Sequence, residues 1–421
     1  MNGNRLWVFL SDQPIGHLDN EGGQLAFCYR ADAPAPVSVT MPLRAEPYLD
    51  EITRAFFQNL LPEGAWRAAL CRQLRIAEHD DFGLLRAVGA DCAGAVALHA
   101  DPEWRPRQGR YAPLAVDELR NWTRNPAGRP AFTSAPGLRL SLAGAQDKLL
   151  VHMDDGLAYL CEDGAPSSVI LKPDIQDPLS GIELSGLNEL LTMTLADACG
   201  LETATVFWFA GSYAVKRFDR APQDAAWVRL HQEDFAQLSG TPTLAKYEQQ
   251  GGPGWRECFS LLDQYASVPA RDRLELLRRL LFNLLVGNFD AHAKNFALLH
   301  AIDGSVRLSP AYDLVNTELY PALSRELAMS IGGEAAPSRL DAAAWARFGV
   351  DTRLRPTVIA RFASTITGAI RQSIDGILAT VEAANPALVE DVYPARRRQQ
   401  FFADYVRRVR ANCDLLERSF K

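Results

Sequence analysis

The chain has 421 residues, of which 48% are hydrophobic and 23% are charged, so it is long enough to form two or three domains with buried cores. A formal net charge of −7 disfavours free-standing nucleic-acid binding, and no apolar run approaches the roughly 18 residues that would span a bilayer. The first apolar run is too short for the core of a signal peptide, so we expect a cytoplasmic protein without a membrane partner.

The seven cysteines lie far apart in the sequence. None belongs to a CxxC pair and none has a neighbouring histidine at metal-ligand spacing, which argues against a zinc site and against a disulfide framework. We expect reduced and mostly packed thiols.

Residues 1–110 are predicted to form a small α+β module. Two alternating, strand-like runs, RLWVFLSD and PVSVTMPL, precede the segment from Thr53 to Leu74, whose apolar residues recur every three to four positions. The following segment, from Trp104 to Pro136, is rich in Pro, Gly and Arg, which indicates a connector.

Residues 111–235 are predicted to form a β-rich lobe. From Leu138 the runs LRLSLAG, KLLVHM, LAYLCE and SVILKP are typical of short strands, with a hairpin turn at DDG. ELSGLNELLTMTLADACG then shows helical spacing, with Gly200 as its predicted C-terminal stop. Two more strands, ATVFWFA and YAVKRF, are joined by the tight turn GS. These elements predict a sheet of five or more strands with one inserted helix.

Residues 236–421 are predicted to form a helical lobe. RDRLELLRRLLFNLLVG places its leucines on one face, as a core helix does, and the C-terminal segments are strongly amphipathic.

The core helix runs into VGNFDAHAKNFALL, which places Asp290, His292, Lys294 and Asn295 within six residues. The spacing suits phosphoryl transfer, in which a carboxylate orients the attacking hydroxyl and an amide oxygen one turn later binds Mg²⁺ on the nucleotide's phosphates. Asp313 in LSPAYDLVN follows a predicted hairpin, where a kinase keeps its second hard oxygen ligand for Mg²⁺. We therefore predict Asp290 as the catalytic carboxylate and Asn295 and Asp313 as metal ligands. The alternative for each residue is a helix cap or turn former.

Two lysines compete for the phosphates. YAVKRF contains Lys216 and imitates the V-A-I-K motif of protein kinases. In kinase-like folds, however, the lysine strand precedes an inserted helix whose glutamate orients the lysine. Lys172 precedes the helix that contains Glu189, and Lys216 follows it. We therefore predict that Lys172 binds the phosphates, that Glu189 orients it, and that Lys216 lies on the surface of a strand.

A phosphate-covering loop is predicted at SLAGAQDK, where small residues let backbone N–H groups approach phosphate oxygens. Its candidate contacts are Ala143, Gly144, Ala145, Gln146, Asp147 and Lys148. An adenine-binding hinge is predicted in LHQEDFAQL, through backbone groups near Glu233, Asp234 and Phe235, and an ordinary strand-to-helix link is the alternative. His292 stands where the common eukaryotic kinases place a lysine, and we add it to the predicted cofactor contacts.

The chain resembles the HipA-type serine/threonine kinases, the toxin half of bacterial toxin–antitoxin pairs. The resemblance covers nearly the whole chain, in the blocks FFQNLLPEG, SLAGAQDK, ILKP, NELL, KRFDR, LHQEDFAQ, KYEQQGGPG, FDAHAKNF and SPAYDLVN. Ala291 departs mildly, because the family usually shows Gly there. The resemblance implies an α+β, protein-kinase-like fold, with a HipA-like N-terminal subdomain (1–110), a nucleotide-binding lobe (111–235) and a helical catalytic lobe (236–421).

The resemblance also implies the activity and its partners. These are a kinase that uses ATP and Mg²⁺, a protein substrate such as an aminoacyl-tRNA synthetase, and a dimeric helix-turn-helix antitoxin of the HipB type. Operator DNA would be bound and repressed mainly through the antitoxin, and the best-known family member targets glutamyl-tRNA synthetase. Ser141 is implied as an autophosphorylation site in the nucleotide loop, with a local hydrogen bond to its own backbone as the alternative.

Two other functions stay open. A small-molecule kinase of the aminoglycoside-phosphotransferase type shares the Asp-x4-Asn spacing and the later Asp, but it lacks the N-terminal module and the SLAGAQDK block. A non-catalytic co-repressor with a vestigial kinase site is the second alternative. The complete set of polar groups argues against it, because a dead site need not retain all of them.

Overall fold

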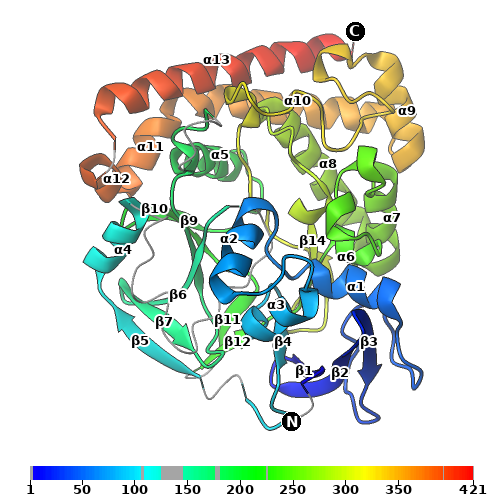
Figure 1. Ribbon diagram of the computed structural model, residues 1–421. Coiled ribbons are helices and arrows are strands. Elements are labelled where there is room, and N and C mark those ends of the chain that lie inside the picture. The colour runs from blue at the N-terminus through cyan, green and yellow to red at the C-terminus, as the bar shows by residue number, and fades with distance from the viewer. Residues whose placement is uncertain are drawn as a thin grey trace. The chain divides into compact units, whose positions relative to one another are not determined.

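The computed structural model describes residues 3–105, 109–124, 146–175, 181–223, 226–391 and 393–420. Two compact units alternate along the chain. Unit 1 comprises Met1–Leu171, Arg217–Ala245 and Ala297–Val306, and unit 2 comprises Lys172–Lys216, Lys246–Phe296 and Arg307–Lys421. Both units contain helices and antiparallel strands (Figure 1), so the predicted α+β class is confirmed. None of the helices within the described ranges combines the length and apolarity needed to cross a bilayer.

The N-terminal part of unit 1 is built on a four-stranded antiparallel sheet with the order β3-β2-β1-β4. Its strands are β1 (Arg5–Leu10), β2 (Gln13–Glu21), β3 (Gln24–Tyr29) and β4 (Val96–His99), and its helices are α1 (Asp50–Gln58), α2 (Gly64–Leu74) and α3 (Asp81–Val88). Leu6 and Val8 of the central strand β1 are fully buried and share a core with Phe27 and Phe57. α1 packs on β3 and α3 packs on β4, so helices cover the apolar side chains of the sheet.

The predicted strand PVSVTMPL is wrong, because this segment contains only an isolated bridge. Pro36 and Pro42 bound the segment and lack the N–H group that a strand ladder needs. The Tyr29 hydroxyl satisfies the backbone instead, since it accepts from the Val37 N–H at 2.8 Å and donates to the Met41 carbonyl at 2.5 Å.

The remaining strands of unit 1 are also antiparallel. β7 pairs with β5 and β6, β6 pairs with β8, β11 pairs with β12, and β13 pairs with β14. The elements are β5 (Arg110–Leu114), α4 (Val116–Arg124), β6 (Leu149–Asp154), β7 (Leu157–Glu162), β8 (Val169–Lys172), β11 (Arg220–Gln223), β12 (Ala226–Arg229), β13 (Gln232–Asp234), α6 (Phe235–Leu238) and β14 (Ala297–His300). The predicted DDG hairpin is confirmed: Asp155 and Gly156 join β6 to β7, both with positive φ as a two-residue hairpin turn requires. The predicted strand LRLSLAG lies outside the described residues.

Unit 2 combines one β-hairpin with a group of helices. α5 (Ser185–Ala198) ends just before Gly200, as predicted, and β9 (Val206–Phe209) and β10 (Ser212–Lys216) are joined by Ala210 and Gly211 rather than by the predicted turn Gly-Ser. The other elements are α7 (Trp255–Tyr265), α8 (Pro269–Val286), β15 (Val306–Leu308), α9 (Ala342–Thr352), α10 (Pro356–Ser373), α11 (Ile377–Ala384), α12 (Pro386–Asp391) and α13 (Ala395–Ser419). The first residue of β15, Val306, is the last residue of unit 1. α8 packs against α7, α10 and α13, and Figure 1 shows α13 lying along α10.

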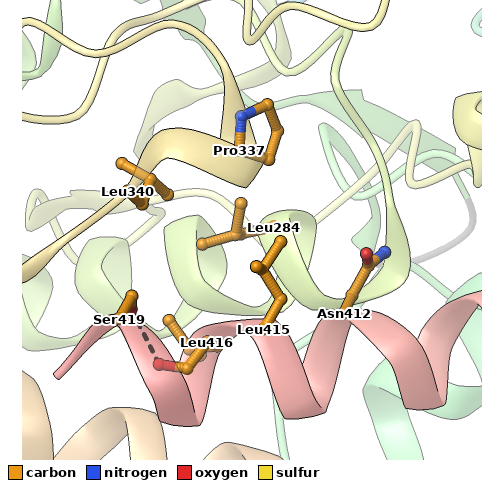
Figure 2. A pocket seen from close by; sticks show the side chains of 7 residues that line it. All are labelled: Leu284, Pro337, Leu340, Asn412, Leu415, Leu416 and Ser419. Atoms are coloured by element: carbon orange, nitrogen blue, oxygen red, sulfur yellow. Dashed lines mark hydrogen bonds between the residues drawn. The ribbon is translucent and has the colours of Figure 1, made fainter. Parts of the chain in front are cut away.

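A small apolar pocket lies among α8, α13 and the short helix η7 (Pro337–Arg339), as Figure 2 shows. Its lining consists of Leu284, Pro337, Leu340, Asn412, Leu415, Leu416 and Ser419. The Asn412 amide donates to Glu318 at 2.9 Å, and the Ser419 hydroxyl donates to the Leu416 carbonyl at 2.7 Å. The polar side chains of the lining thus already bond to the protein, so we assign the pocket no ligand.

A cluster of buried charges joins the N-terminal sheet region to the rest of unit 1. We call it the arginine cluster, and its members are Asp91, Ser167, Arg217, Asp219, Arg220 and Arg229. Asp91 lies 2.7 Å from Arg220, 3.2 Å from Arg229 and 3.3 Å from Arg217, and it also accepts from the Ser167 hydroxyl at 2.6 Å. Burial by itself would raise the pKa of Asp91, but the three guanidinium groups outweigh burial and lower it. Asp91 is therefore a carboxylate that three buried cations share.

We predict that Asp91→Asn lowers the free energy of unfolding by about 3–5 kcal/mol, because it leaves three buried guanidinium groups with one carboxylate of the cluster, Asp219, which pairs with Arg217 and Arg220. Urea denaturation followed by tryptophan fluorescence measures the change. The control is Asp117→Asn, whose side chain is 89% exposed beside Arg120, and it should leave the midpoint unchanged. Equal midpoints for the two variants would contradict a stabilising role for the arginine cluster.

Candidate active site

The loop that carries the predicted catalytic residues begins where α8 ends. Gly287 follows α8 with φ +73°, and a Cβ atom there would lie 2.9 Å from the Cβ of Glu318, so this turn needs glycine. The Gly287 carbonyl accepts from the Glu318 N–H at 3.0 Å, and the Phe289 N–H donates to the Thr317 hydroxyl at 2.9 Å. The start of the loop is thereby fixed to the segment that follows Asp313.

Asp290 stands on this loop with its carboxylate toward Tyr247. The Tyr247 hydroxyl donates to Asp290 Oδ1 at 2.8 Å. The backbone turns back immediately, because the His292 N–H bonds to the Asp290 carbonyl at 2.8 Å and to Asn295 Oδ1 at 3.1 Å. A short helix, η5 (Ala293–Asn295), completes the turn and presents the Asn295 side chain.

Asp313 meets Asn295 from a different segment of unit 2. Asn295 Nδ2 donates to Asp313 Oδ2 at 2.9 Å. Asp313 has φ +58°, a left-handed backbone conformation that aspartate tolerates better than most residues but that still costs energy. The chain before it is held by Ala311, whose N–H and carbonyl bond to the backbone of Glu202 and Ala204 at 2.7 and 2.9 Å. Such strained residues cluster at functional sites.

Lys172 links Asp313 to Glu189. Its Nζ lies 2.8 Å from Glu189 Oε1 and 2.8 Å from Asp313 Oδ1. The side chains of Lys172 and Glu189 are only 11% and 8% exposed, whereas that of Asp313 is 48% exposed. Burial lowers the pKa of Lys172, but the two carboxylates outweigh it and raise the pKa, so the ammonium group keeps its charge. Burial raises the pKa of Glu189, and Lys172 opposes that shift.

The position of Glu189 depends on how α5 is held. Asp174 accepts from the Gly186 N–H at 2.8 Å and from the Ser185 hydroxyl at 3.2 Å, which satisfies the first turn of α5. The buried amide of Asn188 donates to the Asn316 carbonyl at 2.9 Å and to the Tyr320 hydroxyl at 3.0 Å. α5 is therefore tied directly to the segment after Asp313.

Two of the predicted ligand residues lie side by side. The Asn295 side chain presents its amide nitrogen to Asp313, while its oxygen accepts from the His292 N–H. Mg²⁺ prefers oxygen ligands, so the amide would have to turn over to offer its oxygen beside the Asp313 carboxylate. Lys172 supplies a fixed positive charge next to them. A cation, two hard oxygen ligands and a separate carboxylate at Asp290 are the parts that phosphoryl transfer uses.

Of the other predicted site residues, some lie outside the described residues and most of the rest belong to unit 1. Ser141, Ala143, Gly144 and Ala145 are outside the described residues. Gln146, Asp147 and Lys148 belong to unit 1, where Lys148 is buried just before β6. Glu233 and Phe235 also belong to unit 1, at β13 and the first turn of α6, where Asp234 and Gln237 form a capping box. The nucleotide contacts of these residues stay predictions. Lys216 is exposed at the end of β10.

Tyr247 is a site residue that sequence reasoning missed. Its ring packs edge-on against His292, with centroids 5.4 Å apart, in addition to its hydrogen bond to Asp290. The segment KYEQQGGPG, which contains Tyr247, enters the sequence analysis only as one of the blocks that resemble the HipA-type kinases. The tyrosine lies 43 residues before Asp290. No local spacing therefore connects it to the catalytic loop, and only the block itself could have drawn attention to it.

Comparison with known proteins gives matches along nearly the whole chain. The HipA N-terminal domain model matches residues 6–99, and the HipA-like C-terminal domain model matches residues 140–374. The protein Y4mE of Sinorhizobium fredii is 35% identical over 382 residues, which cover 88% of each chain. The serine/threonine-protein kinase toxin HipA of Shewanella oneidensis is 30% identical over 395 residues, which cover 88% of this chain and 89% of that protein.

A solved structure agrees with these matches. It is the Shewanella oneidensis complex of HipA, HipB and operator DNA, one chain of which superposes with a TM-score of 0.80 at 28% identity. The superposition covers 97% of this chain and 96% of that chain, so the predicted protein-kinase-like HipA fold is confirmed. The two domain models and the coverage of these relatives show that this chain belongs to the HipA family of serine/threonine-protein kinase toxins.

Proposed function

We propose that this chain transfers the γ-phosphoryl group of ATP to a serine or threonine of a protein, with Mg²⁺, as the cytoplasmic toxin of a two-protein module. The observation that carries this proposal is the network of Lys172, Glu189, Asp313 and Asn295, whose contacts are 2.8 to 2.9 Å long. A paired lysine and glutamate together with a metal-binding aspartate are what an active kinase requires.

Each residue has a defined task in this proposal. Asp290 accepts the hydrogen bond of the attacking hydroxyl, and Tyr247 holds the carboxylate in one rotamer by donating to Oδ1. Asn295 and Asp313 would hold Mg²⁺, which neutralises the charge that develops on the phosphoryl oxygens. Lys172 would bind the phosphates, and its bond to Glu189 would keep the ammonium group in place if Asp313 held the metal.

The family match supports the proposed partners. The solved Shewanella oneidensis assembly contains HipA, HipB and operator DNA, and this chain covers nearly all of its matched chain, including the N-terminal region. We therefore propose a dimeric helix-turn-helix antitoxin of the HipB type, with operator DNA bound and repressed mainly through it. An aminoacyl-tRNA synthetase is the proposed substrate class, with glutamyl-tRNA synthetase as the family precedent.

The first prediction concerns Asp290 and Ser141. After incubation with Mg-ATP, intact-mass analysis should show one added phosphate on the wild type and none on Asp290→Asn, and peptide mapping should assign the phosphate to Ser141. Removing a positioned catalytic carboxylate costs at least about 100-fold in rate. Ser141→Ala, the matched control for the acceptor, should also gain none. Wild-type phosphorylation of Asp290→Asn would defeat the site assignment, and a full phosphate on Ser141→Ala would defeat the acceptor assignment.

The second prediction separates the two lysines. Lys172→Met should lower kcat/KM for ATP by roughly 10- to 100-fold, because it removes a charge-assisted contact to phosphate. Lys216→Met removes an exposed charge and should be neutral. Lys172→Met leaves Glu189 buried without its cation, so Lys172→Met/Glu189→Gln tests whether lost stability is the cause. Activity restored in the double variant, or lost in Lys216→Met, would contradict the assignment.

The third prediction is that a neighbouring reading frame encodes a helix-turn-helix protein and that this protein forms a stable complex with the chain. The two should co-purify after co-expression, and light scattering should give the mass of a complex that contains an antitoxin dimer. Asp290→Asn should bind equally well, because binding does not depend on catalysis. Separate elution of the two proteins would instead favour the small-molecule kinase.

A further inference from the structure

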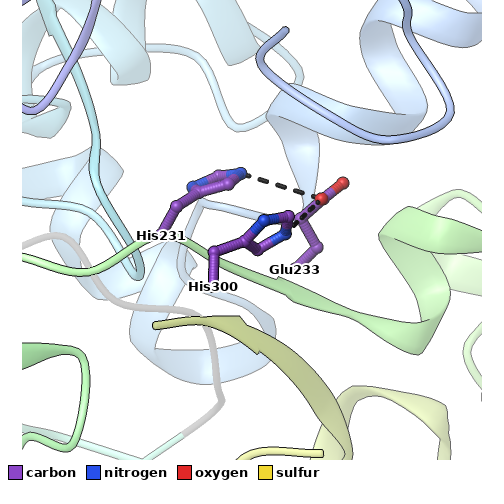
Figure 3. Close-up of side chains that lie close together, drawn as sticks. All are labelled: His231, Glu233 and His300. Carbon is purple, nitrogen blue, oxygen red and sulfur yellow. Dashed lines mark hydrogen bonds and ion pairs between the residues drawn. The ribbon is translucent and has the colours of Figure 1, made fainter. Parts of the chain in front are cut away.

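Two histidines and one glutamate meet on one face of a β-ladder in unit 1 (Figure 3). β13 and β14 pair antiparallel, with Gln232 opposite Leu299, and the His300 N–H donates to the His231 carbonyl at 2.8 Å. His231 and His300 are therefore opposite each other across the ladder. Glu233 follows His231 by two residues and so lies on the same face, because side chains alternate along a strand.

The three side chains have the spacing of metal ligands. Glu233 Oε1 lies 3.1 Å from His300 Nε2 and 3.8 Å from His231 Nε2, and one ligand atom from each residue lies within 4.8 Å of the others. A tetrahedral zinc ion with bonds of about 2.0–2.2 Å keeps its ligand atoms roughly 3.3–3.6 Å apart. The two measured separations lie on either side of that range, so small side-chain rotations would suffice.

The charges of the group are unbalanced within the described part of unit 1. Glu233 is fully buried, and its ionisable contacts in that part are the two histidines, which are charged only when protonated. An uncharged imidazole is the form that binds metals. Glu233 Oε2 and His231 Nδ1 are buried without a hydrogen-bond partner of normal geometry among the described residues. A buried carboxylate without a fixed cation is costly, and a divalent ion would remove that cost.

We propose that His231, Glu233 and His300 form a binding site for one zinc ion. Two imidazole nitrogens and one carboxylate oxygen are a donor set that zinc uses in proteins. The Val37 carbonyl lies 3.0 Å from His231 Nε2 and offers a further oxygen, and the Val39 N–H donates to Glu233 Oε1 at 3.3 Å. The His300 side chain is 26% exposed, which leaves the ion a way in.

The site would join three distant segments of unit 1. These are the proline-bounded segment around Val37, the end of β12 with β13, and the end of β14. The alternative is a metal-free group of hydrogen bonds, in which His231 donates to Val37 and His300 donates to Glu233. The two arrangements predict different effects of replacing the His300 imidazole with an amide. Zinc binding would be lost in the first arrangement, whereas the hydrogen bond to Glu233 could be kept in the second.

The test is zinc binding by the full-length chain. Chains stripped with a chelator are titrated with Zn²⁺ against a chromophoric chelator in excess Mg²⁺, and thermal unfolding is recorded with and without zinc. His300→Gln keeps a hydrogen-bond donor for Glu233 but removes the imidazole. His17→Ala is the matched control, because His17 is 20% exposed and lies 3.4 Å from Asp19.

Wild type and His17→Ala should each bind one more zinc ion per chain than His300→Gln binds. Zinc should raise the unfolding temperature of wild type and His17→Ala but not that of His300→Gln. Glu233→Gln should match His300→Gln. A wild type that binds no zinc would overturn the proposal. Equal zinc binding by wild type and His300→Gln would overturn it too, because the ion would then lie elsewhere.

Discussion

The candidate active site depends on the two ion pairs that the Lys172 ammonium group forms with Glu189 and Asp313. The ammonium group is shared by Glu189 from α5 and Asp313 from the segment before η6 (Thr317–Leu319), at 2.8 Å each. Because the lysine and Glu189 are nearly buried, neither charge can be left alone, and α5 must stay where it satisfies the lysine. Asn188, one residue before Glu189, bonds to the backbone at Asn316. The same contacts that orient the lysine therefore also position Asp313, one of the two proposed metal ligands.

Much of this arrangement could be predicted from local sequence. The leucine pattern of α8, the Asp-Gly hairpin between β6 and β7 and the helix ending before Gly200 each rest on residues close together in the chain, where periodicity and turn chemistry suffice. The spacing of Asp290 and Asn295 is local in the same way, and the predicted hairpin after it led to Asp313, which the structure brings into contact with Asn295. The choice of Lys172 over Lys216 as the phosphate-binding lysine rested on the expected order of strand and helix in a kinase-like fold, because the motif around Lys216 pointed to the other lysine.

The rest depends on partners that the sequence does not bring together. PVSVTMPL alternates like a strand, but its prolines and the Tyr29 hydroxyl decide its conformation. Tyr247 reaches Asp290 across 43 residues. The cysteines argued against zinc, yet the proposed ligands are two histidines and a glutamate, and Glu233 and His300 are 67 residues apart. No spacing rule covers such a set, because only the pairing of β13 with β14 creates it.

The alternation of the two units along the chain affects how the protein can be made. β13 lies in Arg217–Ala245, but its partner β14 lies in Ala297–Val306, after a stretch that belongs to unit 2. A nascent chain that has reached residue 245 therefore carries β13 without its partner, an open edge that attracts other strands. Unit 1 is not complete before Val306 has been added, and unit 2 extends to Lys421. Truncated products would therefore expose unpaired strand edges and would be prone to aggregate.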